Sequence, residues 1–209
     1  MGNLFHPDSP VIKKLARLWD LMALNLLWLI CSIPLITAGA ATTAMYRVIF
    51  RQLEEGETSI VKTYFQAFKE NFTQGTLLWL MIAVVGGVLC FDGWFLLGQK
   101  GKIALLWAPF VLLALLLGVG NAYGFAILAR YRTTIQAALR NAYLLMFLEL
   151  ISTLLLVVVN TVPWVCMLLL PDVFLRTALF WLLLGGSLPA YINGKLLLHI
   201  FKKRQAEPS

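Results

Sequence analysis

Charged residues are scarce in this chain: Asp, Glu, Lys and Arg together make up 13% of its 209 residues, whereas 60% are hydrophobic. Soluble domains carry about 25% charged residues. A soluble fold of this length buries only ~70% of the surface that its unfolded chain exposes, so this composition would leave large apolar patches in water. The scarcity of charge therefore excludes an ordinary soluble domain and predicts a protein whose solvent is lipid.

Histidine and cysteine, which build most metal sites and all disulfides, are also few: the chain has 2 His and 3 Cys. Cys31, Cys90 and Cys166 all fall in apolar stretches, where a free thiol behaves as a small hydrophobic group, so we expect no disulfide framework. His6 and His199 have no cysteine or carboxylate neighbour at a ligand spacing. We expect no metal and no other cofactor.

Sequence signatures of catalysis are lacking as well. We find no nucleophile elbow, phosphate-binding loop, zinc-peptidase motif or dinucleotide fingerprint. Glu149 lies in an apolar stretch without a catalytic partner that the sequence identifies, and Asp92 and Lys195 lie near the ends of such stretches, where water or headgroups reach them. The net charge of +7 is carried mainly by the segments between apolar stretches, where attraction to lipid explains it. We therefore expect no enzyme and no nucleic-acid partner.

Long uncharged stretches take the place of the missing charge. About 20 helical residues cross the ~30 Å hydrocarbon layer, and backbone groups in lipid must bond within their own segment, which favours helices. The predicted fold class is all-α, a polytopic membrane bundle forming a single domain over residues 1–209. We expect about five transmembrane helices, at residues 20–46, 76–98, 103–129, 144–170 and 174–198. A possible signal-peptide site at residues 38–40 lies in an apolar run that continues past it, so we expect this segment to be retained.

The distribution of Lys and Arg predicts the orientation. If all five segments cross the membrane, an outside N-terminus puts most of the 17 Lys and Arg residues in the cytoplasm, together with the tail at residues 199–209. Pro34 and Gly39 interrupt the first segment, however, which is either a kinked span or a re-entrant hairpin. A hairpin would also keep the basic N-terminus inside, so the pattern leaves the N-terminal orientation open.

The longest connection contains an amphipathic cytoplasmic helix, predicted at residues 58–73. Tyr64, Phe65, Phe68 and Phe72 fall on one face at helical spacing, and polar residues fall on the opposite face. The helix either lies on the inner membrane surface, with its aromatic face among the headgroups, or docks a partner's cytoplasmic domain.

Polar and small residues inside the apolar segments are candidate packing or ligand positions. An amide in lipid must bond to a neighbouring helix or to a polar solute, so the asparagines act either as interhelical contacts or as the lining of a polar path. These asparagines are Asn25, Asn121, Asn160 and Asn193. Gly39 and Thr43 have the four-residue spacing that lets helices approach closely, within this chain or against another membrane protein.

A weak internal repeat relates two of the polar connections. Gln66-Ala67 and Asn71 recur as Gln136-Ala137 and Asn141. Read as a duplication, it makes the chain two copies of span, cytoplasmic helix and span, followed by a fifth span. This interpretation favours five crossings with the N-terminus outside.

Two stretches resemble the YesL family of bacterial membrane proteins. They are NLLWLICSIPLITAGAATTAMY at residues 25–46, which includes Trp28, Pro34 and Thr37, and IVKTYFQAFKENFTQGTLLWL at residues 60–80. ARYRTTIQAALRNA at residues 129–142 is also similar. The family has no established molecular activity and no agreed catalytic residues, so the motif positions are candidates for packing or interaction.

The resemblance implies a bacterial cytoplasmic membrane protein, of a kind commonly encoded beside ABC importers of oligosaccharides. From it we expect a non-enzymatic accessory or regulatory component, whose partners are membrane lipid and the permease subunits of a carbohydrate ABC importer. An independent small-solute transporter or channel, lined by the asparagines and the broken first segment, is the alternative.

Overall fold

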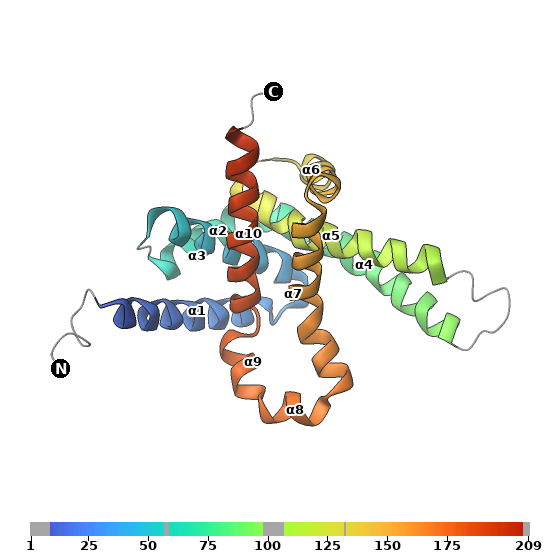
Figure 1. Cartoon of the computed structure of the whole chain (residues 1–209), viewed down its shortest axis with the longest axis horizontal. Helices are drawn as coiled ribbons and strands as arrows, with labels where there is room; N and C mark the ends of the chain where they lie inside the picture. The colour runs from blue at the N-terminus through green and yellow to red at the C-terminus, as the bar shows by residue number, and fades with distance from the viewer. Residues whose placement is uncertain (1–8, 57–58, 98–106, 132, 207–209) are drawn as a thin grey trace.

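The computed structural model describes residues 9–56, 59–97, 107–131 and 133–206, and within these ranges the chain is helical and contains no β-strand. The prediction of an all-α chain is confirmed for this part of the sequence. Figure 1 shows the helices, which are α1 (Pro10–Ser32), the short 3₁₀ helix η1 (Leu35–Thr37), α2 (Ala38–Glu55), α3 (Ile60–Glu70), α4 (Phe72–Leu97), α5 (Trp107–Arg130), α6 (Ile135–Leu148), α7 (Leu150–Leu169), α8 (Pro171–Arg176), α9 (Ala178–Leu184) and α10 (Ser187–Ala206).

Three of the described helices are long and apolar enough to cross a membrane: Val11–Ser32 in α1, Phe72–Leu96 in α4 and Pro109–Arg130 in α5. A fourth span is reached if α6 and α7, which bend by 113° at a short break, are counted as one broken span. These lengths indicate a membrane-embedded helical protein. Five crossings stay a prediction.

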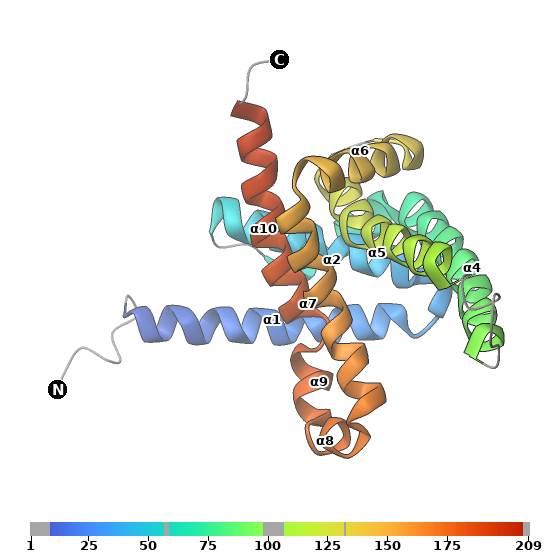
Figure 2. The ribbon, with the colours of Figure 1, turned by 45° about the vertical axis from the view of Figure 1, so that its right-hand side comes forward.

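The first predicted segment, residues 20–46, forms two helices instead of one continuous span. α1 ends at Ser32, the chain turns through Pro34 and η1, and α2 runs back along α1 (Figure 2). The backbone leaves the helical conformation at Pro34, which is extended (φ −75°, ψ 97°) and has no amide hydrogen with which to continue the helix, so α1 ends here. Thr37 stabilises the turn, because its hydroxyl donates to the carbonyl oxygen of Cys31 at 2.6 Å. A hairpin therefore replaces the single kinked helix.

Two side-chain hydrogen bonds fix the antiparallel pairing of α1 with α2. Near the turn, the indole Nε1 of Trp28 donates to the hydroxyl of Thr42 at 3.1 Å. Towards the open end, Nε2 of Gln52 donates to the carboxylate of Asp20, also at 3.1 Å. The register of the hairpin is thus set at both ends.

α2 is the centre of the bundle and packs against α1, α3, α4, α5 and α10. Most of its residues between Gly39 and Phe50 are buried. Gly39 lies so close to α4 that a Cβ there would overlap the backbone of Gly75 and the side chain of Trp79. The small-residue spacing from Gly39 to Thr43 therefore serves a contact inside this chain.

The amphipathic helix α3 lies within its predicted range, and its apolar residues divide between two surfaces. Tyr64 is fully buried and Phe68 packs against the core. Phe65 and Phe72 are exposed by 42% and 43%, and Val61 is exposed as well. α3 is thus docked on the bundle, and it keeps a narrow outward stripe of Val61 and Phe65, which Phe72 at the start of α4 extends. These three residues are called the α3 stripe below.

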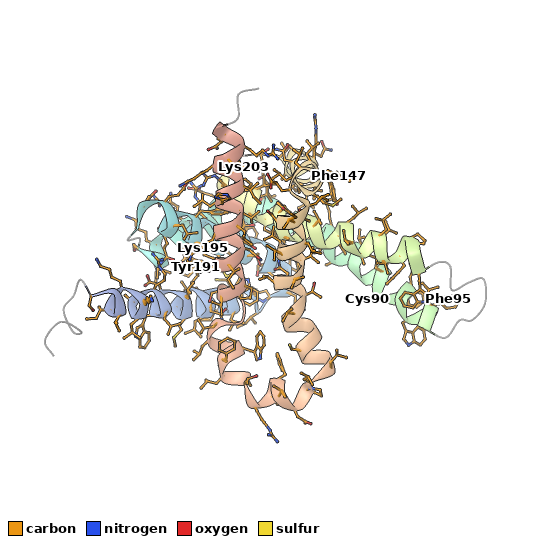
Figure 3. The ribbon with its side chains drawn as sticks, viewed as in Figure 1. Cys90, Phe95, Phe147, Tyr191, Lys195 and Lys203 are labelled. Carbon is orange, nitrogen blue, oxygen red and sulfur yellow. The ribbon has the colours of Figure 1, made fainter. Side chains whose placement is uncertain are left out.

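The predicted segment at residues 144–170 is bent near its start, where α6 meets α7 at Glu149. The carboxylate of Glu149 accepts hydrogen bonds from Nζ of Lys203 and Nη2 of Arg204, each at 2.9 Å. Lys203 lies at the far end of α10, beside this bend (Figure 3). The ion pairs therefore tie the bend to α10. The sequence identified no partner for Glu149, because both partners lie on a distant helix.

The last predicted segment, residues 174–198, is divided among α8, α9 and α10. α10 runs antiparallel to α7 and continues to Ala206, so the first residues of the predicted tail are helical (Figures 1 and 2). Tyr191 connects α10 to α1, since Nη1 of Arg17 donates to its hydroxyl at 2.9 Å. The ammonium group of Lys195 lies 4.8 Å from the centre of the same ring (Figure 3).

Candidate functional site

A cavity of about 410 Å³ lies where α1, α2, α4, α5 and α7–α10 meet. Its wall combines three tryptophans, Trp28, Trp79 and Trp181, with two asparagines, Asn121 and Asn160. We call it the tryptophan cavity. Sites for small molecules have volumes of roughly 300–1,000 Å³ and are apolar, with a few polar groups that orient the ligand. The size and lining of this cavity are typical of such a site.

The tryptophans contribute ring surface, because two of their N–H groups are already bonded to the protein. Nε1 of Trp28 donates to Thr42, and Nε1 of Trp181 donates to the hydroxyl of Thr177, each at 3.1 Å. The Trp181 ring also stacks on Phe174, with ring centres 5.4 Å apart and planes 24° from parallel. These contacts hold the two indoles in fixed positions, which reduces the ordering that a ligand would have to impose.

The asparagines supply the hydrogen-bonding groups of the cavity. Nδ2 of Asn160 donates to the carbonyl oxygen of Leu156, one turn earlier in α7, at 2.7 Å. Asn121 makes no side-chain hydrogen bond to any residue in the described ranges. A primary amide offers two donors and an acceptor. Asn121 is therefore the polar side chain of the cavity that is most available to a ligand.

Asn25 supports one wall of the cavity from behind, because it joins the end of α9 to the start of α10 beside the lining residue Gly186. This fully buried side chain accepts from the N–H groups of Gly186 (2.8 Å) and Ser187 (2.9 Å), and it donates to the carbonyl oxygen of Leu182 (2.7 Å). A single amide thus caps the start of α10 and the end of α9. A Cβ at Gly186 would lie 2.9 Å from the ring of Trp28 and 3.0 Å from Oδ1 of Asn25, so this close approach requires glycine.

The charge of the tryptophan cavity restricts its ligands. No described lining residue is charged, and no group of three His, Cys, Asp or Glu side chains in the described ranges could hold a metal. The cavity is suited to an uncharged molecule.

The structure brings together some of the positions that the sequence singled out and separates others. Trp28 from α1 and Asn121 from α5 share the tryptophan cavity. The two asparagines of the weak repeat occupy different positions. Asn71 follows α3, where its Nδ2 donates to the carbonyl oxygen of Ala67 at 3.0 Å, whereas Asn141 is exposed in the interior of α6.

Sequence reasoning did not identify Trp79 and Trp181 as cavity residues. Their position in the sequence was an available signal. Tryptophan in membrane helices is enriched at the two interfaces, so a tryptophan well inside an apolar run indicates a role other than anchoring at an interface. Trp79 lies about two turns beyond Phe72, the first residue of α4. The convergence of the three indoles depends on the α1–α2 hairpin, which sequence spacing does not reveal.

Comparison with known proteins gives a partial match. A family described as a protein of unknown function, DUF624, matches residues 21–93, about a third of the chain. No curated protein and no solved structure matches the chain. The matched part covers the end of α1, all of α2 and α3, and most of α4, and it supplies Trp28, Thr42 and Trp79 to the cavity. The N-terminal helices are therefore similar to those of an uncharacterised family.

Proposed function

We propose that this chain is a non-enzymatic protein of the bacterial cytoplasmic membrane that assists an oligosaccharide ABC importer and binds a sugar in the tryptophan cavity. The observation that carries the proposal is the wall of that cavity, in which three indoles face a shared space with two amides. The proposal includes assignment to the YesL-like proteins, which rests on the residues of the α1–α2 hairpin and of α3.

The chemistry of a sugar ring fits this wall. A pyranose presents faces of C–H groups that pack on indole rings, and a rim of hydroxyls that exchange hydrogen bonds with amides. The side-chain N–H and C=O groups of Asn121 make no hydrogen bond to any described residue and can bond to the hydroxyls of a sugar. No described lining residue carries a charge that would favour an ionic ligand. A purely apolar ligand would leave the amide of Asn121 unsatisfied, which costs free energy away from water.

The proposed orientation follows from charge. The last turn of α5 carries Arg130, and the last turn of α10 carries Lys203 and Arg204. Excess Lys and Arg mark cytoplasmic ends, so we place the C-terminus in the cytoplasm. The α3 stripe then lies at the cytoplasmic surface, where it would contact the permease subunits of the importer.

Equilibrium dialysis of the purified protein in mild detergent against radiolabelled neutral mono- and disaccharides tests the ligand. We expect saturable binding of at least one sugar, a tenfold or greater loss of affinity in Asn121→Leu, and wild-type affinity in Asn141→Leu. Asn141 is the matched control because it is exposed and lies outside the cavity. Equal affinities of the two variants would refute the assignment of the site.

Copurification tests the partner. Tagged protein isolated from its native membrane in mild detergent should retain the permease subunits of a carbohydrate importer, identified by mass spectrometry. Phe65→Ser should reduce this retention, whereas Phe147→Ser, which alters an exposed aromatic residue on α6, should not. Isolation of the wild-type protein alone would argue against the accessory role.

An independent transporter of small solutes is the second candidate, and the unpartnered amide of Asn121 at the middle of α5 favours it. Discontinuous helices mark binding sites in transporters. The break at Gly185–Gly186 lines the cavity, and the break at Pro34 precedes the lining residue Ala38. Reconstituted vesicles would then show sugar flux that Asn121→Leu abolishes. Binding without flux leaves the accessory role as the conclusion.

A further inference from the structure

A second, polar cavity of about 850 Å³ lies at the arginine-rich end of the bundle, apart from the tryptophan cavity. It is formed by the middle of α2, the ends of α3 and α5, and the starts of α4 and α6. We call it the arginine cleft. Most of its described lining residues are polar or charged, which is unusual in a chain that is 60% hydrophobic. Among its lining residues are Arg47, Glu70, Asn71, Thr73, Arg130 and Thr133.

Arg47 is the residue on which the inference depends. Its guanidinium is half-buried, and Nη1 donates to the carbonyl oxygens of Ala129 at 3.0 Å and Arg130 at 3.4 Å. No carboxylate in the described ranges pairs with Arg47. Arg130 differs, because its Nη2 lies 2.9 Å from the carboxylate of Glu54. A half-buried cation without a carboxylate partner favours an anion beside it.

The remaining groups of the cleft agree with an anionic ligand. α4 and α6 both begin at the cleft, and the first N–H groups of a helix point outward and carry partial positive charge. The hydroxyls of Thr73 and Thr133 add further donors. Glu70 is the one acidic residue among the described lining residues, and its carboxylate accepts a hydrogen bond from Nε2 of Gln66 at 3.0 Å.

We propose that the arginine cleft binds a phosphate group, carried either by the headgroup of an anionic lipid or by a soluble phosphate. The planar guanidinium of Arg47 matches the geometry of phosphate oxygens, and threonine hydroxyls supply the additional donors that phosphate accepts. Basic pockets between helices at the cytoplasmic side are sites for anionic headgroups. The arginine cleft shares no lining residue with the tryptophan cavity, so phosphate binding and sugar binding are independent proposals.

The experiment compares two sources of phosphate in the purified full chain. One arm measures binding of phosphatidylglycerol in mixed micelles by native mass spectrometry, with phosphatidylcholine as the zwitterionic control. The other arm measures inorganic phosphate by isothermal titration. Binding in the first arm identifies a lipid headgroup, and binding in the second identifies a soluble ligand. The proposal is overturned if neither binds, or if phosphatidylglycerol binds no better than phosphatidylcholine and inorganic phosphate does not bind.

Variants locate the site. Arg47→Gln should lower the affinity at least tenfold, whereas Arg140→Gln, an exposed arginine on α6 outside the cleft, should lower it less than twofold. Arg47 also caps the end of α5, so its loss could disturb the fold. Thr133→Glu leaves that cap in place and puts a second carboxylate in the cleft, and it too should weaken binding at least tenfold. Equal binding by Thr133→Glu and Arg140→Gln would refute the assignment.

Discussion

Replacing Asn25 with leucine removes three hydrogen bonds that join α1 to the junction of α9 and α10. The residue is fully buried, so water does not replace the lost partner. The N–H groups of Gly186 and Ser187 and the carbonyl oxygen of Leu182 are then left unsatisfied. A side-chain hydrogen bond in a membrane protein contributes on average ~0.6 kcal/mol, and a buried group left unsatisfied costs about 1–3 kcal/mol. At ~0.6 kcal/mol each the three bonds give about 2 kcal/mol, and three unsatisfied groups at the low end of their range give about 3 kcal/mol, so we expect the free energy of unfolding to fall by at least about 2 kcal/mol.

The comparison variant is Asn160→Leu, because the amide of Asn160 donates only to Leu156 in its own helix. That carbonyl lies within a continuous helix and can keep its backbone partner, so the expected loss is below about 1 kcal/mol. Reversible unfolding in mixed micelles of increasing SDS content, followed by circular dichroism and tryptophan fluorescence, measures both. The account of the α9–α10 junction is refuted if Asn25→Leu is no more destabilising than Asn160→Leu.

Two further predictions concern packing and charge. Gly39→Ala should lower the free energy of unfolding by about 1–3 kcal/mol, because the added Cβ would overlap the backbone of Gly75. The control is Gly87→Ala, where nothing lies within 4 Å of the added Cβ, and it should be neutral or slightly stabilising. Equal effects of the two variants would contradict the close contact between α2 and α4. Glu149 pairs with Lys203 and Arg204 on α10, each at 2.9 Å, so Glu149→Gln should lower the free energy of unfolding by about 1 kcal/mol, since both partners are partly exposed. An unchanged free energy of unfolding in Glu149→Gln would exclude a stabilising role for this carboxylate.

The helical class and the amphipathic helix α3 follow from local pattern. Long uncharged stretches require helices in lipid, and aromatic residues spaced from Tyr64 to Phe72 give a helical face that can be read without tertiary knowledge. The sequence pattern could not show that some residues of this aromatic face are buried and others exposed. Tyr64 packs under neighbouring helices while Phe65 stays exposed, and only the positions of those neighbours decide between the two environments.

The breaks between helices were harder to predict, because long-range contacts hold them. Pro34 marked the first break, but a proline permits both a kink and a turn, and the Trp28–Thr42 bond belongs to the turn. At the bend before α7, Glu149 is held by Lys203, on a helix more than fifty residues later. These breaks bring the lining residues of the tryptophan cavity together, so the residues that line it could not be predicted from their spacing along the chain.

The most direct test of the central claim, a sugar site among the cavity indoles, is a fluorescence titration of two tryptophan variants with a sugar that binds in dialysis. One variant has the cavity residues Trp28, Trp79 and Trp181 replaced by phenylalanine, and the other has the exposed Trp19 and Trp94 replaced. We expect the sugar to change the emission of the wild type and of the second variant, and to leave that of the first unchanged. A response that persists without the cavity tryptophans, or disappears without the exposed ones, would contradict the site.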